Sequence, residues 1–182
     1  DVLLGLNIRA NALDEAADLR PDATGGKFNS PLRVDQMARA GCVYIGFGAE
    51  SADKVTLEAM GKGGFILANG VEKVNGFEFP RTMLEGIKNT KRSGIHANCT
   101  WIMAYPGETL QHLKTTVGFI LWQQDYYASF GDKPDSVNRR LFVATAYPGT
   151  EMFKEPKARA ILSKNFGIKF DAAGDPECDE NL

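Results

Sequence analysis

The regular alternation of short apolar runs with helix-like segments is the feature that most constrains how this chain can fold. Apolar runs at residues 2–9, 43–47 and 97–103 are each followed by a glycine- or proline-containing stretch and then by a helical pattern. The sequence Ala-Tyr-Pro-Gly also occurs twice, at 104–107 and 146–149. Strands that alternate with helices are typical of parallel βα units with right-handed crossovers. The sequence therefore predicts an α/β protein with a parallel sheet.

The individual elements follow from periodicity and from turn residues. Segment 61–80 is rich in glycine and asparagine and is expected to form an excursion such as a hairpin, and Ser51 is expected to cap the helix that follows the second strand. Four βα units cannot close an eight-stranded barrel, which takes about 200 residues or more, so an open or partial barrel is expected. The predicted helices span 32–40, 52–60, 81–93, 109–125 and 158–165, and a fourth strand lies between 137 and 147.

Composition excludes several classes of protein. The formal net charge is −2, and acidic and basic residues are interspersed, so the chain has no basic stripe to bind a phosphate backbone. This composition neither supports nor excludes a nucleic-acid partner. Cys42, Cys99 and Cys178 are too scattered for a metal cluster or a disulfide framework. No apolar run is long enough to cross a membrane, and no signal peptide is evident. A cytoplasmic location without membrane contact is expected.

Small and polar residues alternate with apolar residues along three of the predicted strands. Because side chains alternate across a strand, these residues share one face, and chemistry at such a face gathers where the strands end. Glu50 follows a Gly-Phe-Gly strand, where a buried carboxylate needs a hydroxyl, an ammonium or an arginine as its partner. The polar face comprises Gly5, Asn7, Arg9, Gly46, Gly48, Glu50, Asn98 and Thr100, with the segment around Thr145 at the same rim.

Other reactive side chains are weaker candidates. His96 and His112 are expected to be solvent-facing or to have structural roles, and Cys42 and Cys99 are expected to pack at strand ends. No catalytic residue and no metal ligand is assigned within the chain.

Several motifs in this order resemble the second half of a radical S-adenosylmethionine domain. They are Gly-Cys-Val-Tyr-Ile-Gly-Phe-Gly-Ala-Glu-Ser at 41–51, Leu-Glu-Ala-Met-Gly-Lys-Gly at 57–63, Lys-Arg-Ser-Gly-Ile at 91–95 and Tyr-Pro-Gly-Glu-Thr at 105–109. The resemblance is to the branch that contains methylthiotransferases, the oxygen-independent coproporphyrinogen oxidase and cobalamin-dependent methylases and cyclases. Ala104 stands where that family usually has glycine before the Pro-Gly turn.

The resemblance implies a fold, a reaction and cofactors. The fold is an incomplete TIM-like (β/α)6 barrel. This chain would hold the C-terminal portion of it at residues 1–153, with insertions near 14–30 and 64–79, followed by a helix and polar tail at 154–182. The reaction is cleavage of S-adenosylmethionine to a 5′-deoxyadenosyl radical by a 4Fe-4S cluster, with flavodoxin or ferredoxin as electron donor. The cluster ligands would lie outside this chain, cobalamin would be a further cofactor of the full-length protein, and the fragment alone would be inactive.

The resemblance also implies which residues contact the cofactor. Glu50 would meet the ribose hydroxyls, and Lys62 would reach the carboxylate of S-adenosylmethionine. Thr100 matches a polar position on the fifth strand of the family, and Ala144 and Thr145 match the strand whose backbone meets adenine. Asn7 and Arg9 match inward polar positions on the third strand.

Two other readings stay open on the sequence. A non-radical lyase or isomerase would use an acid–base pair such as Arg9 and Glu50 on a phosphate or carboxylate substrate. A non-catalytic module would keep the same surface for interactions. As an excised part of the barrel that the resemblance implies, the chain would leave its first strand, at 2–9, without a neighbour on one side, which favours a homodimer.

Overall fold

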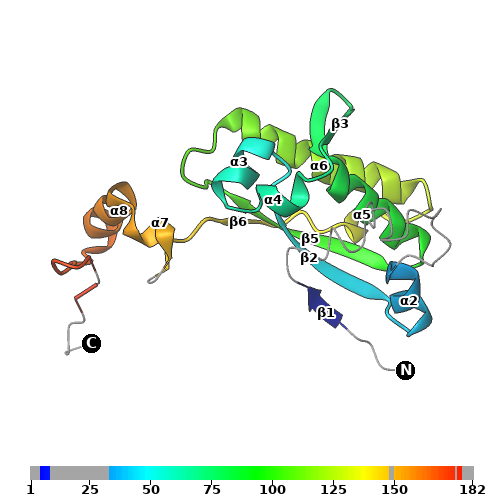
Figure 1. Cartoon of the computed structure of the whole chain (residues 1–182), viewed down its shortest axis with the longest axis horizontal. Helices are drawn as coiled ribbons and strands as arrows, with labels where there is room; N and C mark the ends of the chain where they lie inside the picture. The colour runs from blue at the N-terminus through cyan, green and yellow to red at the C-terminus, as the bar shows by residue number, and fades with distance from the viewer. Residues whose placement is uncertain (1–4, 9–32, 148–149, 175, 178–182) are drawn as a thin grey trace. The chain divides into compact units, whose positions relative to one another are not determined.

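The computed structural model describes residues 5–8, 33–147, 150–174 and 176–177 of the chain. The chain divides into two compact units, Asp1–Val143 and Ala144–Leu182. The first unit contains the sheet and most of the helices, and the second contains two short helices near the C-terminus (Figure 1). The predicted boundary between domains at residue 153 stays a prediction.

A parallel sheet forms the centre of the first unit. It contains β1 (Gly5–Ile8), β2 (Tyr44–Glu50), β5 (His96–Met103) and β6 (Leu141–Val143), in the order β1-β2-β5-β6. All three neighbouring pairs are parallel, which confirms the α/β class with a small parallel sheet. β1 lies at an edge of the sheet, and dimerisation through it stays a prediction.

The described strands form an open sheet, and no barrel closure is seen among them. The predicted fold is part of an incomplete TIM-like barrel; the described residues form an open four-stranded sheet with helices, and nothing found supports a TIM barrel. Between β2 and β5 the chain forms a two-stranded antiparallel hairpin, as the composition of 61–80 predicts. The remaining elements of this unit are α2 (Arg33–Arg39), α3 (Lys54–Ala59), α4 (Gly63–Ile66), β3 (Val71–Val74), β4 (Phe77–Pro80), α5 (Arg81–Arg92), α6 (Leu110–Ala128) and the 3-10 helix η1 (Pro134–Ser136).

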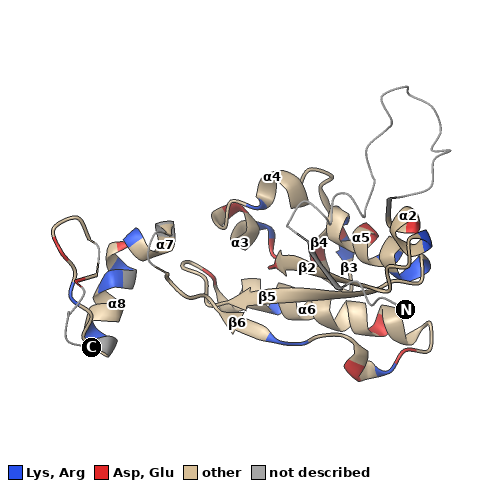
Figure 2. Cartoon of the chain, turned by 90° about the horizontal axis from the view of Figure 1, so that it is seen from below, with Lys and Arg blue, Asp and Glu red and all other residues tan. Residues whose placement is uncertain are grey.

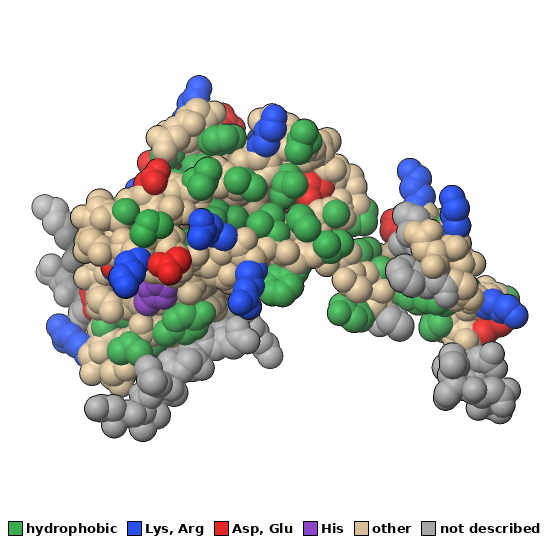
Figure 3. All heavy atoms as spheres, turned by 180° about the vertical axis from the view of Figure 1, so that it is seen from behind, with side chains coloured by type: hydrophobic (Ala, Val, Ile, Leu, Met, Phe, Trp, Pro, Cys, Tyr) green, Lys and Arg blue, Asp and Glu red, His purple; other side chains and the backbone are tan. Residues whose placement is uncertain are grey.

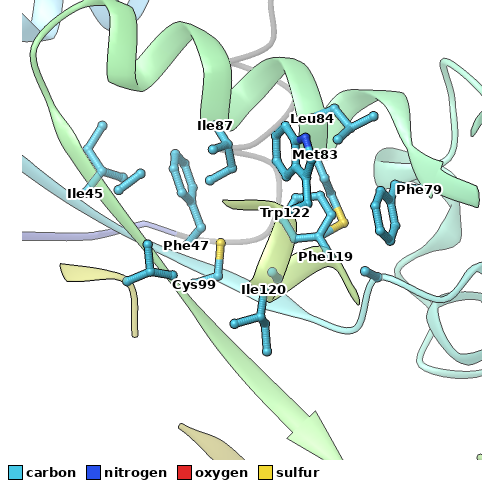
Figure 4. Close-up of a cluster of buried hydrophobic side chains, with 14 of the residues drawn as sticks. Ile45, Phe47, Phe79, Met83, Leu84, Ile87, Cys99, Phe119, Ile120 and Trp122 are labelled. Carbon is cyan, nitrogen blue, oxygen red and sulfur yellow. The ribbon is translucent and has the colours of Figure 1, made fainter. Parts of the chain in front are cut away.

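One face of the sheet packs against α5 and α6 and is apolar (Figure 4). Phe119 lies in the middle of this core, with its ring centroid 5.2 Å from Phe79, 5.6 Å from Trp101 and 5.0 Å from Trp122. Burying a side chain of this size contributes roughly 1.5–3 kcal/mol. The core joins strand residues to helix residues: Ile45, Phe47, Cys99 and Trp101 with Met83, Leu84, Ile87, Phe119, Ile120 and Trp122.

α6 is the longest helix and carries few charged side chains along its length (Figure 2). Thr109 caps it: the Thr109 hydroxyl accepts from the His112 backbone N–H, and His112 Nδ1 accepts from the Thr109 N–H, both at 3.3 Å. This reciprocal pair satisfies two backbone donors at the helix start. His112 therefore has the structural role expected for it.

Side chains of α6 also complete the sheet where a strand is missing. β6 pairs with Trp101–Met103, and among the described residues no strand lies beside the first half of β5 on that side. The Tyr127 hydroxyl accepts from the Ala97 N–H and donates to the Ala97 carbonyl, both at 3.2 Å, and Gln123 Nε2 donates to the same carbonyl at 2.9 Å. Both backbone groups of Ala97 are thus paired without a neighbouring strand.

The cap of α3 differs from the prediction. Asp53, and not Ser51, is the N-cap: its Oδ1 accepts from the Thr56 N–H at 2.9 Å. Ser51 Oγ instead lies 3.1 Å from Thr116 Oγ1 on α6 and accepts from the Asp53 N–H. A tertiary contact with α6 therefore removes Ser51 from the role that local sequence suggested for it.

The second unit contains α7 (Glu151–Lys154) and α8 (Pro156–Phe166). Phe153 of α7 is buried and packs edge-on against Phe170, with ring centroids 5.5 Å apart. Arg159 Nε donates to the Phe153 carbonyl at 3.1 Å, and its guanidinium lies over the Phe170 ring. The predicted helix at 158–165 is thus present and begins two residues earlier.

Candidate functional site

The second face of the sheet is polar and partly exposed, in contrast to the packed face. On β2, Ile45, Phe47 and Ala49 are buried, while the residues between them are not. β5 shows the same alternation in register with β2, so that Tyr44 pairs with His96, Gly46 with Asn98 and Gly48 with Thr100. We call this set of six residues, together with Glu50, the open face.

Glu50 ends β2 in an unusual backbone conformation. Its φ of 64° lies in the left-handed region, and the pairing register with β5 shifts between Gly48 and Glu50. This conformation costs a residue other than glycine about 1–2 kcal/mol. Such strain often accompanies a functional role, because the surrounding structure must hold it in place.

Lys62 is the partner of Glu50. Lys62 Nζ lies 2.8 Å from Glu50 Oε1 and donates to the Gly48 carbonyl at 3.3 Å. The Lys62 side chain is three-quarters buried and that of Glu50 about four-fifths buried. A Cβ atom on Gly48 would lie 3.0 Å from Glu50 Oε1, so glycine leaves the space into which the carboxylate folds. Lys62 sits before the short helix α4, which holds the ammonium over the end of β2.

Thr100 lies beside this ion pair on the neighbouring strand. It pairs in register with Gly48, its side chain is exposed, and its hydroxyl donates to the Phe47 carbonyl at 3.4 Å. The structure thus brings together Glu50, Lys62 and Thr100.

The other predicted site residues lie on β1, outside the described residues, or in the second compact unit. Asn7 pairs with Gly46 in the backbone register of β1, and Arg9 lies outside the described residues. Ala144 and Thr145 belong to the second compact unit. Their roles stay predictions.

A polar network on β5 was missed by the sequence reasoning. His96 Nε2 lies 2.9 Å from the Ser136 carbonyl, and Asn98 Oδ1 accepts from the Asn138 N–H at 2.7 Å. The two side chains hold the end of η1 and the residues after it against β5. The signal that could have revealed this was the pair of polar residues, His96 and Asn98, on the same strand face as Thr100.

The buried thiol next to the site is not a nucleophile. Burial, and to a smaller degree the negative charge of Glu50, raises the pKa of Cys99 to about 12. A thiol with that pKa stays protonated near neutral pH and is unreactive. Cys42 is also buried, and its Sγ donates to the Tyr44 carbonyl.

The turn after β5 also carries backbone strain. Ala104 has a φ of 60°, the left-handed conformation that the expected glycine would adopt without cost. Glu108 Oε2 accepts from the Ala104 N–H at 2.6 Å and holds the turn. The second Pro-Gly turn, at 148–149, lies outside the described residues.

The distribution of charge, of metal-ligating groups and of apolar helices adds to the description of the surface. The face of the molecule in Figure 3 shows acidic and basic side chains interspersed among hydrophobic ones. Within the described ranges, no group of three or more His, Cys, Asp and Glu side chains is placed to hold a metal ion. No helix in the same part of the chain is long and apolar enough to cross a membrane.

Comparison with known proteins gives one distant relative. The chain is 29% identical over 126 residues to an uncharacterized methyltransferase of Pyrococcus horikoshii. The match covers 69% of this chain but only 22% of that protein, so the chain corresponds to a small part of the relative. No family model matches the chain, and no solved structure matches it.

This comparison corrects the predicted family and reaction. The similarity that is found is to a protein named as a methyltransferase, and no family model for a radical enzyme matches. The prediction of a radical S-adenosylmethionine domain that forms a 5′-deoxyadenosyl radical is therefore wrong on these findings. Nothing found supports the predicted iron–sulfur cluster or cobalamin.

Proposed function

We propose that this chain is part of an S-adenosylmethionine-dependent methyltransferase, and that Glu50 and Lys62 bind that cofactor. The observation that carries the proposal is the 2.8 Å ion pair at the end of β2, held in a strained and partly exposed position. The similarity to a protein named as a methyltransferase supports the reaction class. That the whole protein transfers a methyl group to an acceptor molecule is also part of this proposal.

The chemistry of the two side chains fits the cofactor. Glu50 Oε1 pairs with Lys62, and Oε2 has no hydrogen-bond partner among the described residues, so it is available to ribose hydroxyl groups. An ammonium group has three donors; Glu50 and the Gly48 carbonyl take two, which leaves one for a ligand carboxylate. Thr100 offers a hydroxyl one strand away.

The residues would act by binding and orienting the cofactor. When bound, S-adenosylmethionine supplies a sulfonium methyl group that passes to a nucleophile, and the electron pair of the broken bond stays on sulfur. The conformation of Glu50 and its contact with Lys62 would hold the ribose and the carboxylate of S-adenosylmethionine at set positions. Holding the reacting groups in a set orientation favours the reaction. Asn7, Arg9, Ala144 and Thr145 are further proposed contacts of this ligand.

Calorimetric titration with S-adenosylmethionine tests the proposal. Lys62→Met should weaken binding by about tenfold to a hundredfold, because a charge-assisted hydrogen bond is lost. Lys88→Met is the matched control, since Lys88 forms an ion pair of similar length and exposure with Glu85 on α5. An unchanged affinity in Lys62→Met, or no binding by the unaltered protein, would contradict the proposal.

A second variant separates placement of the carboxylate from loss of charge. Gly48→Ala removes no charged group, but its methyl group would meet Glu50 Oε1 at 3.0 Å and displace it. The proposal expects weaker binding of S-adenosylmethionine with little change in stability. Unaltered binding would show that the position of the Glu50 carboxylate does not matter.

A further inference from the structure

Asn98 lies on the open face beside a stretch of β2 that presents no side chains to that face. Its register partner is Gly46, and the partner of Thr100 is Gly48. Both glycines are partly exposed, so a ligand could approach the backbone of β2 at this level. About 13 Å of strand separates Gly46 from Glu50, at roughly 3.3 Å per residue.

The hydrogen bonds of Asn98 fix the orientation of its amide. The Asn138 backbone N–H, which can only donate, lies 2.7 Å from one end of the amide, so that end is the oxygen. The amide nitrogen therefore lies on the other side, 3.3 Å from His96 Nε2.

His96 cannot accept from that nitrogen. His96 Nε2 lies 2.9 Å from the Ser136 carbonyl, which can only accept, so Nε2 carries a hydrogen. A protonated ring nitrogen has no lone pair to offer to Asn98. The Asn98 amide N–H groups consequently have no acceptor among the described residues.

We infer that Asn98 determines specificity for the methyl acceptor by donating an N–H to a carbonyl or ring nitrogen of a planar heterocycle. This inference rests on the proposed methyltransferase function. The missing side chains at Gly46 and Gly48 let a flat ring lie close to β2, within reach of the Asn98 amide. The rings of Tyr44 and His96, with centroids 6.2 Å apart and planes 20° from parallel, lie at the far end of the open face. The Glu50–Lys62 pair lies at the near end, where the cofactor is proposed to bind.

Nuclear magnetic resonance gives a direct test on the unaltered protein. Titration with adenine or cytosine, which offer ring-nitrogen or carbonyl acceptors, should shift the side-chain amide signals of Asn98. Indole is the control ligand, because it is planar and has a donor but no acceptor, and it should leave those signals in place. Absence of a shift with both bases, or an equal shift with indole, would overturn the inference.

A substitution gives the second test. Asn98→Asp keeps an oxygen for the Asn138 N–H but replaces the donor with an acceptor, so base affinity should fall about tenfold or more. Asn75→Asp, at the exposed turn of the β3–β4 hairpin, is the matched control. Equal base affinity in Asn98→Asp and in the unaltered protein would overturn the inference.

The affinity for S-adenosylmethionine, measured separately, distinguishes the two proposals. Intact binding of S-adenosylmethionine with no response of Asn98 to either base removes only the role of Asn98. Base binding that depends on Asn98, without any binding of S-adenosylmethionine, removes the methyltransferase proposal and with it the assignment of the base as methyl acceptor.

Discussion

The two faces of the central sheet use the same two strands for different purposes. On the packed face, Phe47 and Trp101 are almost fully buried against helices. On the open face, their neighbours in sequence are Gly48 and Thr100, which leave the backbone accessible. Because side chains alternate along a strand, each residue can serve one purpose only. Substitutions on the packed face should therefore change stability, and those on the open face should change ligand binding.

The largest effect is expected from the packed face. Phe119→Ala should lower the free energy of unfolding by about 3–5 kcal/mol, because a buried aromatic ring is lost and a cavity remains. Chemical denaturation measures this change. Thr100→Ala is the open-face counterpart and should cost less than about 1 kcal/mol. Similar costs for the two variants would remove the distinction between the faces.

A smaller loss of stability is expected where α6 completes the sheet. Tyr127→Phe removes the hydroxyl that pairs with both backbone groups of Ala97. Leaving the buried N–H of Ala97 unpaired should cost about 1–3 kcal/mol. Thermal unfolding checks this value, with Tyr126→Phe as the control, because the Tyr126 hydroxyl has no hydrogen-bond partner among the described residues. An equal effect of both variants would mean that the Ala97 contacts contribute nothing.

A gain in stability is expected at the turn that follows β5. Ala104→Gly should raise the free energy of unfolding by about 1 kcal/mol, because glycine adopts a positive φ without steric cost. Chemical denaturation is again the measurement. A loss of stability would indicate that the Ala104 methyl group makes contacts worth more than the strain.

The smallest expected effect is electrostatic: the charge of Glu50 on the open face acts on the Cys99 thiol on the packed face. Burial raises the pKa of Cys99, and the charge of Glu50 adds to this rise. Since the pKa in the folded state lies above the ordinary value of 9.0, the contribution of Cys99 to stability is full below about pH 9 and is lost as the pH rises toward 12. Glu50→Gln should lower the pKa of Cys99 slightly, which thiol titration by ultraviolet absorbance measures. An unchanged pKa would mean that the faces are electrostatically independent.

The sequence predicted what depends on local pattern and missed what depends on distant contacts. The strands β2 and β5 and the helices α5 and α6 follow from apolar periodicity and from glycine at helix ends. The role of Ser51 could not be predicted, because Thr116 lies 65 residues away in the chain. The same holds for Tyr127 and Ala97, since hydroxyl-to-backbone pairing leaves no trace in periodicity.

The candidate site was predicted in part for the same reason. Strand alternation places Glu50 and Thr100 on one face, and the cost of burying a carboxylate requires a partner for Glu50. That Lys62 is this partner depends on how α3 and α4 return the chain to the end of β2. The orientation of the Asn98 amide depends on Asn138, which is 40 residues away.

The pairing of Ala97 with α6 affects which part of the sheet opens first. Because Tyr127 and Gln123 already bind the backbone at the start of β5, β6 can detach without leaving Ala97 unpaired. Local opening should therefore stop at Trp101, where β6 begins to pair. In hydrogen–deuterium exchange, the amide of Ala97 should be protected far longer than those of β6. The hydroxyl of Tyr127 and the amide of Gln123 thus set where fraying of this sheet edge ends, and the β2–β5 pair keeps its register.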